Sequence, residues 1–141
     1  ERLREAGKEY GTTTGRPRRC GWFDGVAARY TIALNGCHSI SFTRLDVLDS
    51  FEQVKVCVAY EVDGRRRETF PSSRADLLAA KPIYEELSGW MTDTSGCRNF
   101  DDLPRAAQDY VRRIERLIGT TAAVVSVGPE RNQAIIVDPV I

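Results

Sequence analysis

Ten residues, Gln53–Val62, carry the most regular pattern in the chain. Hydrophobic side chains recur at every second position, namely at Val54, Val56, Val58, Tyr60 and Val62. This period is typical of a β-strand with one buried face. Asp63-Gly64 follows directly and favours a tight hairpin turn, so we expect Arg67–Phe70 to return as the partner strand. The fold must therefore bury one face of a sheet.

Two segments show helix patterns with typical ends. The first is Gly25–Asn35, with Asp24 as its N-cap and Gly36 just past its end. The second is Asp101–Ile118, which we expect to start at Asp102 or Leu103, with Pro104 in its first turn. Its expected buried stripe consists of Leu103, Ala107, Tyr110, Ile114, Leu117 and Ile118.

Weaker patterns complete the expected architecture. They predict the tail of a helix over Glu1–Lys8, strands over Ser39–Thr43, Ala122–Val127 and Gln133–Val137, a turn or short helix over Leu45–Phe51, and a short helix over Ser72–Ala80. We expect Pro82–Cys97 to be mostly irregular, with one or two short strands. Strands and helices do not alternate as in a doubly wound sheet, so the prediction is an α+β domain.

Length and composition exclude several classes of protein. The 141 residues fit one domain, and 20 basic and 20 acidic residues cancel, so no bulk charge favours nucleic acid or a membrane surface. The apolar runs are too short to span a bilayer, and no secretory leader opens the chain. Four cysteines without a C-x-x-C pair, and a single histidine, predict free thiols and no metal site. Because the chain begins at Glu1 and its one methionine is Met91, we expect a piece of a longer protein.

The loop Tyr10–Phe23 contains three arginines and no acidic residue. Within it, Thr12–Arg18 combines three hydroxyls, backbone N–H groups and guanidinium groups, which together suit a carboxylate or another anion. The arginines on either side of Pro17 could reach two separate anions. The alternative is a solvated basic loop. It is not a P-loop, because G-x-x-x-x-G-K-[ST] is absent.

A second candidate is Asp46, just after a predicted strand. A carboxylate there can accept two hydrogen bonds from neighbouring N–H donors, and guanine presents such a pair at N1 and N2, whereas adenine does not. In an extended chain, the side chain of Arg44 would point to the same side as that of Asp46, and it could stack over a base. The alternative is that Asp46 caps a short helix.

A third candidate, Ser126–Arg131, follows a β-rich run. Its Gly128 would let a ligand approach the backbone closely, although a plain hairpin turn explains the segment equally well. His38 has no placed catalytic partner, so the sequence predicts no catalytic triad.

In order and spacing, these motifs together resemble the C-terminal third of the adenylosuccinate synthase family. The resemblance covers nearly all 141 residues. The segments that carry it are Gly11–Trp22, Thr43–Asp49, Val54–Tyr60, Tyr84–Trp90, Leu103–Glu115 and Ser126–Pro129.

The resemblance implies that residues 1–141 form a single C-terminal α+β domain with antiparallel β-hairpins and a few helices. That domain would belong to a larger α/β GTP-dependent ligase. Members join IMP to L-aspartate in AMP synthesis and release GDP and phosphate. The γ-phosphoryl group of GTP is placed on O6 of IMP and then displaced by the aspartate amine, with magnesium on the phosphates. The resemblance also implies a cytoplasmic homodimer.

Site residues follow from the same resemblance. Aspartate and IMP would be held by Thr12, Thr13, Thr14, Gly15, Arg16, Pro17 and Arg18. GTP would be held by Arg18, Arg44, Leu45, Asp46, Ser126, Val127 and Gly128. Asp46 would read guanine N1 and N2.

The family's phosphate loop, catalytic residues and magnesium ligands belong to its N-terminal part and are absent from this sequence. We therefore expect this chain to supply no catalytic residue, to bind no metal or cofactor by itself, and to be inactive alone. The alternative is a non-catalytic domain that binds a guanine nucleotide or another anion. An RNA-binding module is disfavoured by the zero net charge and the lack of an aromatic stacking platform.

Overall fold

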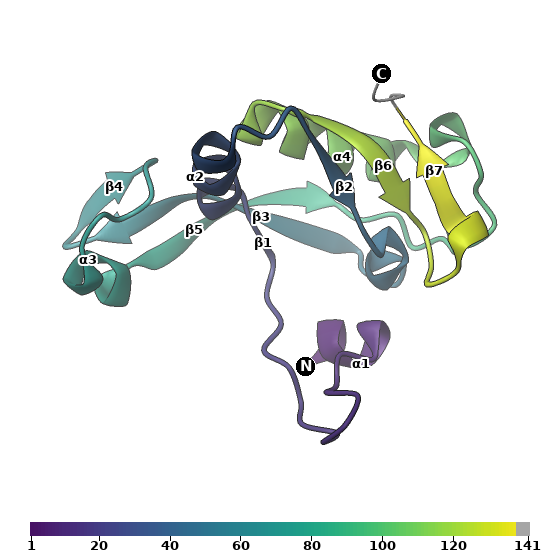
Figure 1. Cartoon of the computed structure of the whole chain (residues 1–141), viewed down its shortest axis with the longest axis horizontal. Helices are drawn as coiled ribbons and strands as arrows, with labels where there is room; N and C mark the ends of the chain where they lie inside the picture. Colours follow the sequence, from purple (N-terminus) through teal and green to yellow (C-terminus); the bar gives the residue numbers. More distant parts are fainter. Residues whose placement is uncertain (138–141) are drawn as a thin grey trace.

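The computed structural model describes residues 1–137, which form two mixed β-sheets with helices around them (Figure 1). The helices are α1 (Arg2–Gly7), α2 (Gly25–Asn35), α3 (Arg74–Ala79) and α4 (Arg105–Ile118). The strands are β1 (Phe23–Asp24), β2 (Ser39–Phe42), β3 (Gln53–Val62), β4 (Arg65–Arg67), β5 (Lys81–Ser88), β6 (Thr121–Ser126) and β7 (Ala134–Ile136). Three short 3-10 helices are η1 (Leu45–Leu48), η2 (Phe100–Asp102) and η3 (Arg131–Gln133).

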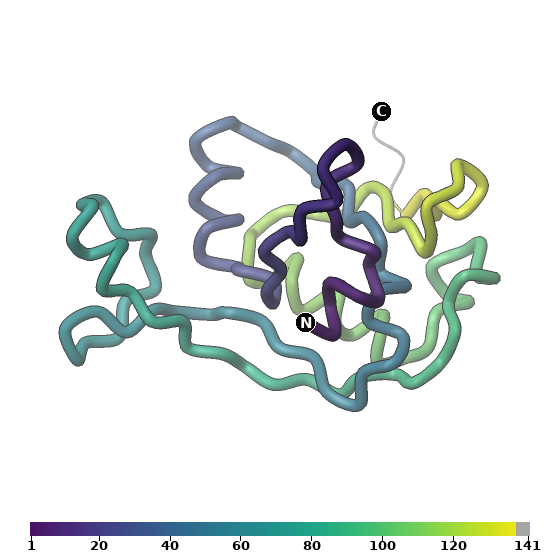
Figure 2. The backbone as a smooth tube through the Cα atoms, turned by 90° about the horizontal axis from the view of Figure 1, so that it is seen from below, coloured from purple at the N-terminus to yellow at the C-terminus, as the bar shows by residue number. Residues whose placement is uncertain are grey.

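The first sheet is centred on β3, which pairs antiparallel with β4 and β5 and parallel with β1. The turn between β3 and β4 has positive φ at both Asp63 (50°) and Gly64 (73°), as a two-residue hairpin turn requires. The predicted turn is thus confirmed, but the return strand is Arg65–Arg67 rather than Arg67–Phe70. In both views β4 and α3 lie at the end of the molecule far from β7 (Figures 1 and 2).

The second sheet has the order β2-β6-β7, with β2 parallel to β6 and β7 antiparallel to β6. Because β2 and β6 run in the same direction, they end at the same edge, at Phe42 and Ser126. The predicted α+β class is confirmed. The expectation of antiparallel hairpins did not include the two parallel pairs, which make both sheets mixed.

Helix α4 supplies much of the core. Its side chains lie in one cluster with Val54 and Val56 of β3 and Ala122 and Val125 of β6. The buried residues of α4 are Ala107, Tyr110, Val111, Ile114 and Ile118, whereas Leu117 is only half-buried. The predicted start of this helix is wrong. Leu103 precedes a proline, which disfavours the helical conformation, and it is extended with a ψ of 144°.

Two predictions about the first sheet differ from the structure. Pro82–Cys97, expected to be mostly irregular with one or two short strands, contains most of the eight-residue strand β5, whose Pro82 is tolerated because β5 lies at the sheet edge. Val58 is half-buried instead of lying in the core, because the β3–β5 register shifts between Cys57 and Ala59.

Helix α2 has the predicted bounds and the predicted ends. The Asp24 carboxylate accepts a hydrogen bond from the Ala27 N–H at 3.0 Å, and Gly36 ends the helix with a φ of 60°. Among residues 1–137, no helix has the length and apolar character needed to cross a membrane.

Helix α1 and the loop that follows it lie to one side of both sheets, at the bottom of Figure 1. Seen from below, this purple segment crosses the middle of the molecule (Figure 2). Helix α1 contacts η1, and the Arg2 guanidinium donates to the Ser50 carbonyl at 3.0 Å.

Candidate functional site

Arg44 and Asp46 form a bidentate ion pair where β2 gives way to η1. Arg44 Nε lies 3.0 Å from Oδ1 of Asp46, and Nη2 lies 2.9 Å from Oδ2. The hydrogen bond with Asp46 raises the pKa of Arg44 above its usual value. We expected the two side chains to lie on one side of an extended chain. The chain is not extended here, and the turn itself brings them together. Arg44 is left-handed (φ 59°) and Asp46 lies in the first turn of η1.

Asp46 is mostly buried, with 19% of its side chain exposed. It makes no capping hydrogen bond to η1, so the helix-cap interpretation is wrong. Its neighbour Leu45 is fully buried, backbone included, and anchors η1 in the core.

Ser126, at the end of β6, contacts the Arg44 segment directly. Its Oγ accepts a hydrogen bond from the Arg44 backbone N–H at 2.8 Å. The second and third sequence motifs are thereby joined into one unit.

Val127 and Gly128 continue this unit as a buried turn between β6 and β7. The Val127 N–H donates to the Gln133 carbonyl at 2.9 Å. A Cβ on Gly128 would lie 2.0 Å from Gln133 Oε1, so the space beside the glycine is filled by the Gln133 amide. The segment does connect two antiparallel strands, as the hairpin alternative stated.

The loop Thr12–Arg18 is a narrow, exposed turn. Tyr10 and Pro17 form an antiparallel bridge, the Gly11 N–H donates to the Arg16 carbonyl at 2.9 Å, and Gly15 has a φ of 65°. Arg18 pairs with Glu9 at 3.0 Å. Within residues 1–137 the Arg16 guanidinium has no hydrogen-bond or ion-pair partner.

A cleft of about 430 Å³ lies between residues 18–23 and residues 42–48. Arg18 and Arg19 line one side, and Thr43 and Arg44 line the other, with Phe42 and Tyr110 among the apolar lining residues. We call it the Arg18–Arg44 cleft. Of the predicted site residues, only Arg18 and Arg44 line this cleft. Asp46 and Ser126 are bonded to Arg44 but do not line it, and neither do residues 12–17.

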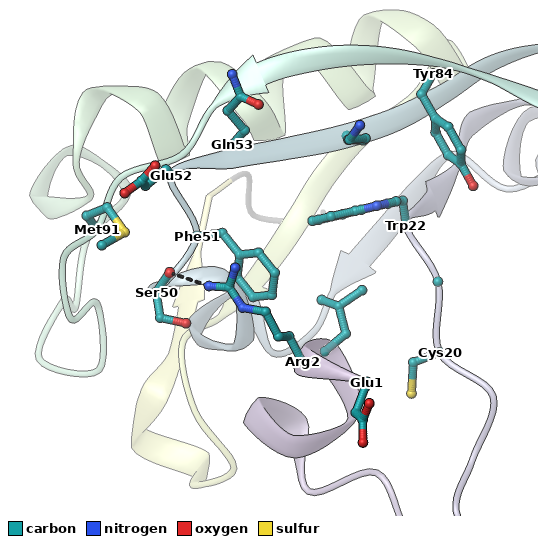
Figure 3. A pocket seen from close by; sticks show the side chains of 13 residues that line it. Glu1, Arg2, Cys20, Trp22, Ser50, Phe51, Glu52, Gln53, Tyr84 and Met91 are labelled. Atoms are coloured by element: carbon teal, nitrogen blue, oxygen red, sulfur yellow. Dashed lines mark hydrogen bonds between the residues drawn. The ribbon is translucent and has the colours of Figure 1, made fainter.

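A larger pocket of about 1160 Å³ contains none of the predicted site residues (Figure 3). Arg2 lies over the Phe51 ring, 4.4 Å from its centre, and Trp22 meets Phe51 edge-on at 5.5 Å. Tyr84 and Met91 also line this pocket, and both are exposed. Trp22 and Tyr84 lie in segments that carry the family resemblance, but the sequence assigned no site role to any residue of this pocket.

Asp49 is a further residue that sequence reasoning missed. Its carboxylate accepts hydrogen bonds from Trp90 Nε1 at 2.7 Å, from the Thr94 N–H at 2.7 Å and from the Thr94 hydroxyl at 3.0 Å. Burial raises the pKa of Asp49, and these hydrogen bonds oppose the rise. Asp49 thus ties the segment Trp90–Thr94 to the end of η1, the turn that carries Asp46.

The family model for adenylosuccinate synthetase matches residues 1–135. The chain belongs to the adenylosuccinate synthetase family. The synthetase of Mycobacterium tuberculosis is 54% identical over 136 residues, covering 96% of this chain and 32% of the relative. That of Synechococcus sp. is 51% identical over 141 residues, covering 99% of this chain and 32% of the relative.

A solved structure of fully ligated adenylosuccinate synthetase from Plasmodium falciparum has the same fold, with a TM-score of 0.89 and 39% identity. The match covers 96% of this chain and 33% of that one. The chain spans about a third of the length of the curated relatives it matches. That this is the C-terminal third stays a prediction.

Proposed function

We propose that this chain is the part of an adenylosuccinate synthetase that binds guanine, aspartate and IMP. The whole enzyme would join IMP to L-aspartate with GTP, releasing GDP and phosphate. Family membership supports the reaction. The single observation that carries the site is the bonded unit of Arg44, Asp46 and Ser126 beside Arg18.

Asp46 is the residue that reads guanine. Its two oxygens can together accept several hydrogen bonds, so the N1–H and N2–H of guanine can share the carboxylate with Arg44 or displace it. Adenine has no N1–H and no amine at C2, so it would leave the acceptors unsatisfied in a mostly buried place. The Ser126 hydroxyl, bonded to the Arg44 N–H, and the turn Val127–Gly128, which is buried in this structure, would form the opposite wall of the guanine site.

The loop Thr12–Arg18 is the proposed anion site for aspartate and IMP. Its threonine hydroxyls are exposed, and the Arg16 guanidinium is free of partners in the described part of the chain, so it can form a bidentate pair with a carboxylate. Arg18 lines the Arg18–Arg44 cleft and would contact GTP.

Magnesium, which the family reaction implies, finds no fitting ligand set among the residues that the structure describes. Across residues 1–137, no three His, Cys, Asp or Glu side chains gather closely enough to hold a metal ion. What these residues contribute is binding and orientation of the base and of the carboxylates. For this reason we propose that the chain is inactive when isolated.

The guanine role is tested in a protein of full family length that carries this chain. Asp46→Asn keeps the size of the side chain but turns one acceptor oxygen into a donor facing guanine. We expect the KM for GTP to rise about tenfold or more, since a mispaired buried group costs 1–3 kcal/mol. The KM for aspartate should stay unchanged. Asp101→Asn, on the exposed η2, is the matched control.

Three outcomes distinguish the proposed activity, the role of Asp46 and the alternative of a non-catalytic binding domain. Absence of GTP-dependent adenylosuccinate formation by the unmodified protein would reject the proposed activity. An equal KM for GTP in Asp46→Asn and Asp101→Asn would reject the role of Asp46. Calorimetric titration of the same full-length protein with GDP and ADP adds the remaining distinction. Guanine-selective binding by a protein that forms no product would favour a non-catalytic binding domain.

The loop is tested by Arg16→Met, which keeps an unbranched apolar stem but removes the guanidinium and its charge. We expect the KM for aspartate to rise at least tenfold, because a charge-assisted bidentate contact is lost. Arg74→Met, on α3 at the far end of the molecule, should leave this KM unchanged (Figure 1). An equal KM for aspartate in Arg16→Met and Arg74→Met would reject the role of Arg16.

A further inference from the structure

Gln133 contacts the segment between Ser126 and Glu130 in three ways. Its backbone carbonyl accepts from the Val127 N–H at 2.9 Å, and its side-chain Oε1 accepts from the Glu130 N–H at 3.1 Å. Its amide also fills the space beside Gly128, where a Cβ would meet Oε1, Cδ and Nε2 at 2.0–2.6 Å. The conformation of the turn therefore depends on a side chain that lies several residues further along.

The same amide connects the turn to the segment that follows β5. Gln133 Nε2 lies 3.4 Å from the Ser95 carbonyl, and the adjacent Thr94 is fully buried and bonded to Asp49. Asp49 directly follows η1, which carries Asp46. The two walls of the proposed guanine site thus meet twice, once through Ser126 and Arg44 and once through Gln133, Thr94 and Asp49.

We propose that Gln133 is a positioning residue for guanine, acting through the backbone of Val127 and Gly128. The inference rests on the proposed function, because it assigns Gln133 to the wall opposite Asp46. Gln133 need not touch the nucleotide. It fixes the distance between the two walls, and so it affects GTP binding and selectivity for the base rather than turnover.

The geometry also explains why position 128 is a glycine. A side chain at this position would push the Gln133 amide out of its place. Because the amide is the end of a flexible side chain, Gly128→Ala should displace it without preventing folding. Gly128→Ala and Gln133→Ala then remove the same contacts, and their effects should not add.

The test uses the full-length protein carrying this chain, assayed for adenylosuccinate formation with GTP and with ATP. Gln133→Ala should raise the KM for GTP roughly fivefold, which corresponds to the loss of one hydrogen bond. It should lower the preference for GTP over ATP by a similar factor. The kcat at saturating GTP and the KM for aspartate should stay unchanged, whereas a purely structural defect would lower the amount of active enzyme and hence kcat.

Three companion variants sharpen the test. Gln133→Glu keeps the size and the oxygen that accepts from the Glu130 N–H but loses the donor that faces the Ser95 carbonyl, so it should restore the GTP affinity only in part. Asn132→Ala removes a neighbouring exposed amide with no hydrogen-bond partner in the described residues and is the matched control. The KM for GTP of the double variant Gly128→Ala/Gln133→Ala should be no higher than that of the single variant with the higher KM.

Two results would overturn the inference while leaving the proposed function intact. One is a KM for GTP in Gln133→Ala equal to that of Asn132→Ala in an enzyme that uses GTP. The other is additive effects of Gly128→Ala and Gln133→Ala. If the unmodified enzyme does not use GTP, the proposed function itself fails.

Discussion

The backbone N–H of Arg44 donates to the hydroxyl oxygen of Ser126 across 82 residues of sequence, at a distance of 2.8 Å. This hydrogen bond joins the end of β2 to the end of β6. We predict that Ser126→Ala lowers the free energy of unfolding by about 1 kcal/mol, because a part-buried N–H loses its partner. Chemical denaturation measures the change. Ser72→Ala, at an exposed serine, should change it by less than about 0.5 kcal/mol, and equal losses would contradict the prediction.

Gly89 lies where β5 leaves β3, with no room for a side chain. A Cβ there would lie 1.8 Å from the Phe51 carbonyl oxygen, and the Gly89 N–H donates to the Glu52 carbonyl at 2.8 Å. Because the obstacle is backbone, Gly89→Ala should cost about 3 kcal/mol of stability. Gly96→Ala meets nothing within 4 Å and should be nearly neutral. Thermal unfolding of the two variants checks this, and similar melting temperatures would refute it.

The Arg113–Glu85 pair predicts a pH dependence of stability. Arg113 on α4 donates to Glu85 on β5 at 2.8 and 2.7 Å, and this bonding lowers the pKa of Glu85 below its ordinary value. The stabilisation is therefore complete above the ordinary pKa of a glutamate and is lost as the pH falls through the lowered value. Since both side chains are about one-third exposed, we expect Arg113→Met to cost at most about 1 kcal/mol at neutral pH.

Denaturation across pH gives the measurement for this pair. The difference between the unmodified chain and Arg113→Met should shrink as the pH falls below the ordinary pKa of a glutamate, about 4.3, and Glu85 becomes protonated. Arg105→Met removes a more exposed pair with Asp109, 83% and 57% exposed, and should have little effect at any pH. A difference for Arg113→Met that does not change with pH would show that the pair acts through packing alone.

The four cysteines should differ in reactivity. Burial, with a smaller contribution from Asp24, raises the pKa of the Cys57 thiol to about 11, whereas Cys20 and Cys37 are exposed. At about pH 8 an alkylating reagent should label Cys20 and Cys37 first, and Cys57 only after denaturant is added. Mass spectrometry of digested protein identifies the labelled positions. Early labelling of Cys57 would contradict its burial in β3.

Elements with local signals were predictable from the sequence. Helix α2 has its cap at Asp24 and its end at Gly36, and the Asp63-Gly64 turn follows from the two residues that accept positive φ most readily. For Pro82–Cys97 only one or two short strands were expected, and the position and length of β5 could not be predicted because its pairing depends on β3. Pro82 argues against a strand in isolation, but it is tolerated at the edge that β3 leaves open.

The candidate site was predictable as a set of residues but not as a geometry. Arg44 and Asp46 were singled out, yet their pairing requires a left-handed arginine, which residue type alone does not indicate. Gln133 gave no signal at all, because its importance lies in the space beside Gly128, which only the folded backbone defines.

The parallel pairing of β2 and β6 has a consequence for how this site tolerates change. The 82 positions that separate Arg44 from Ser126 include β3, β5 and α4, and loops among them can lengthen or shorten without moving one strand end relative to the other. A slip of β2 against β6 by a single residue would shift the two ends by about 3.3 Å and break the contact. Alignment of two strands, rather than length of chain, is what insertions and deletions must preserve here.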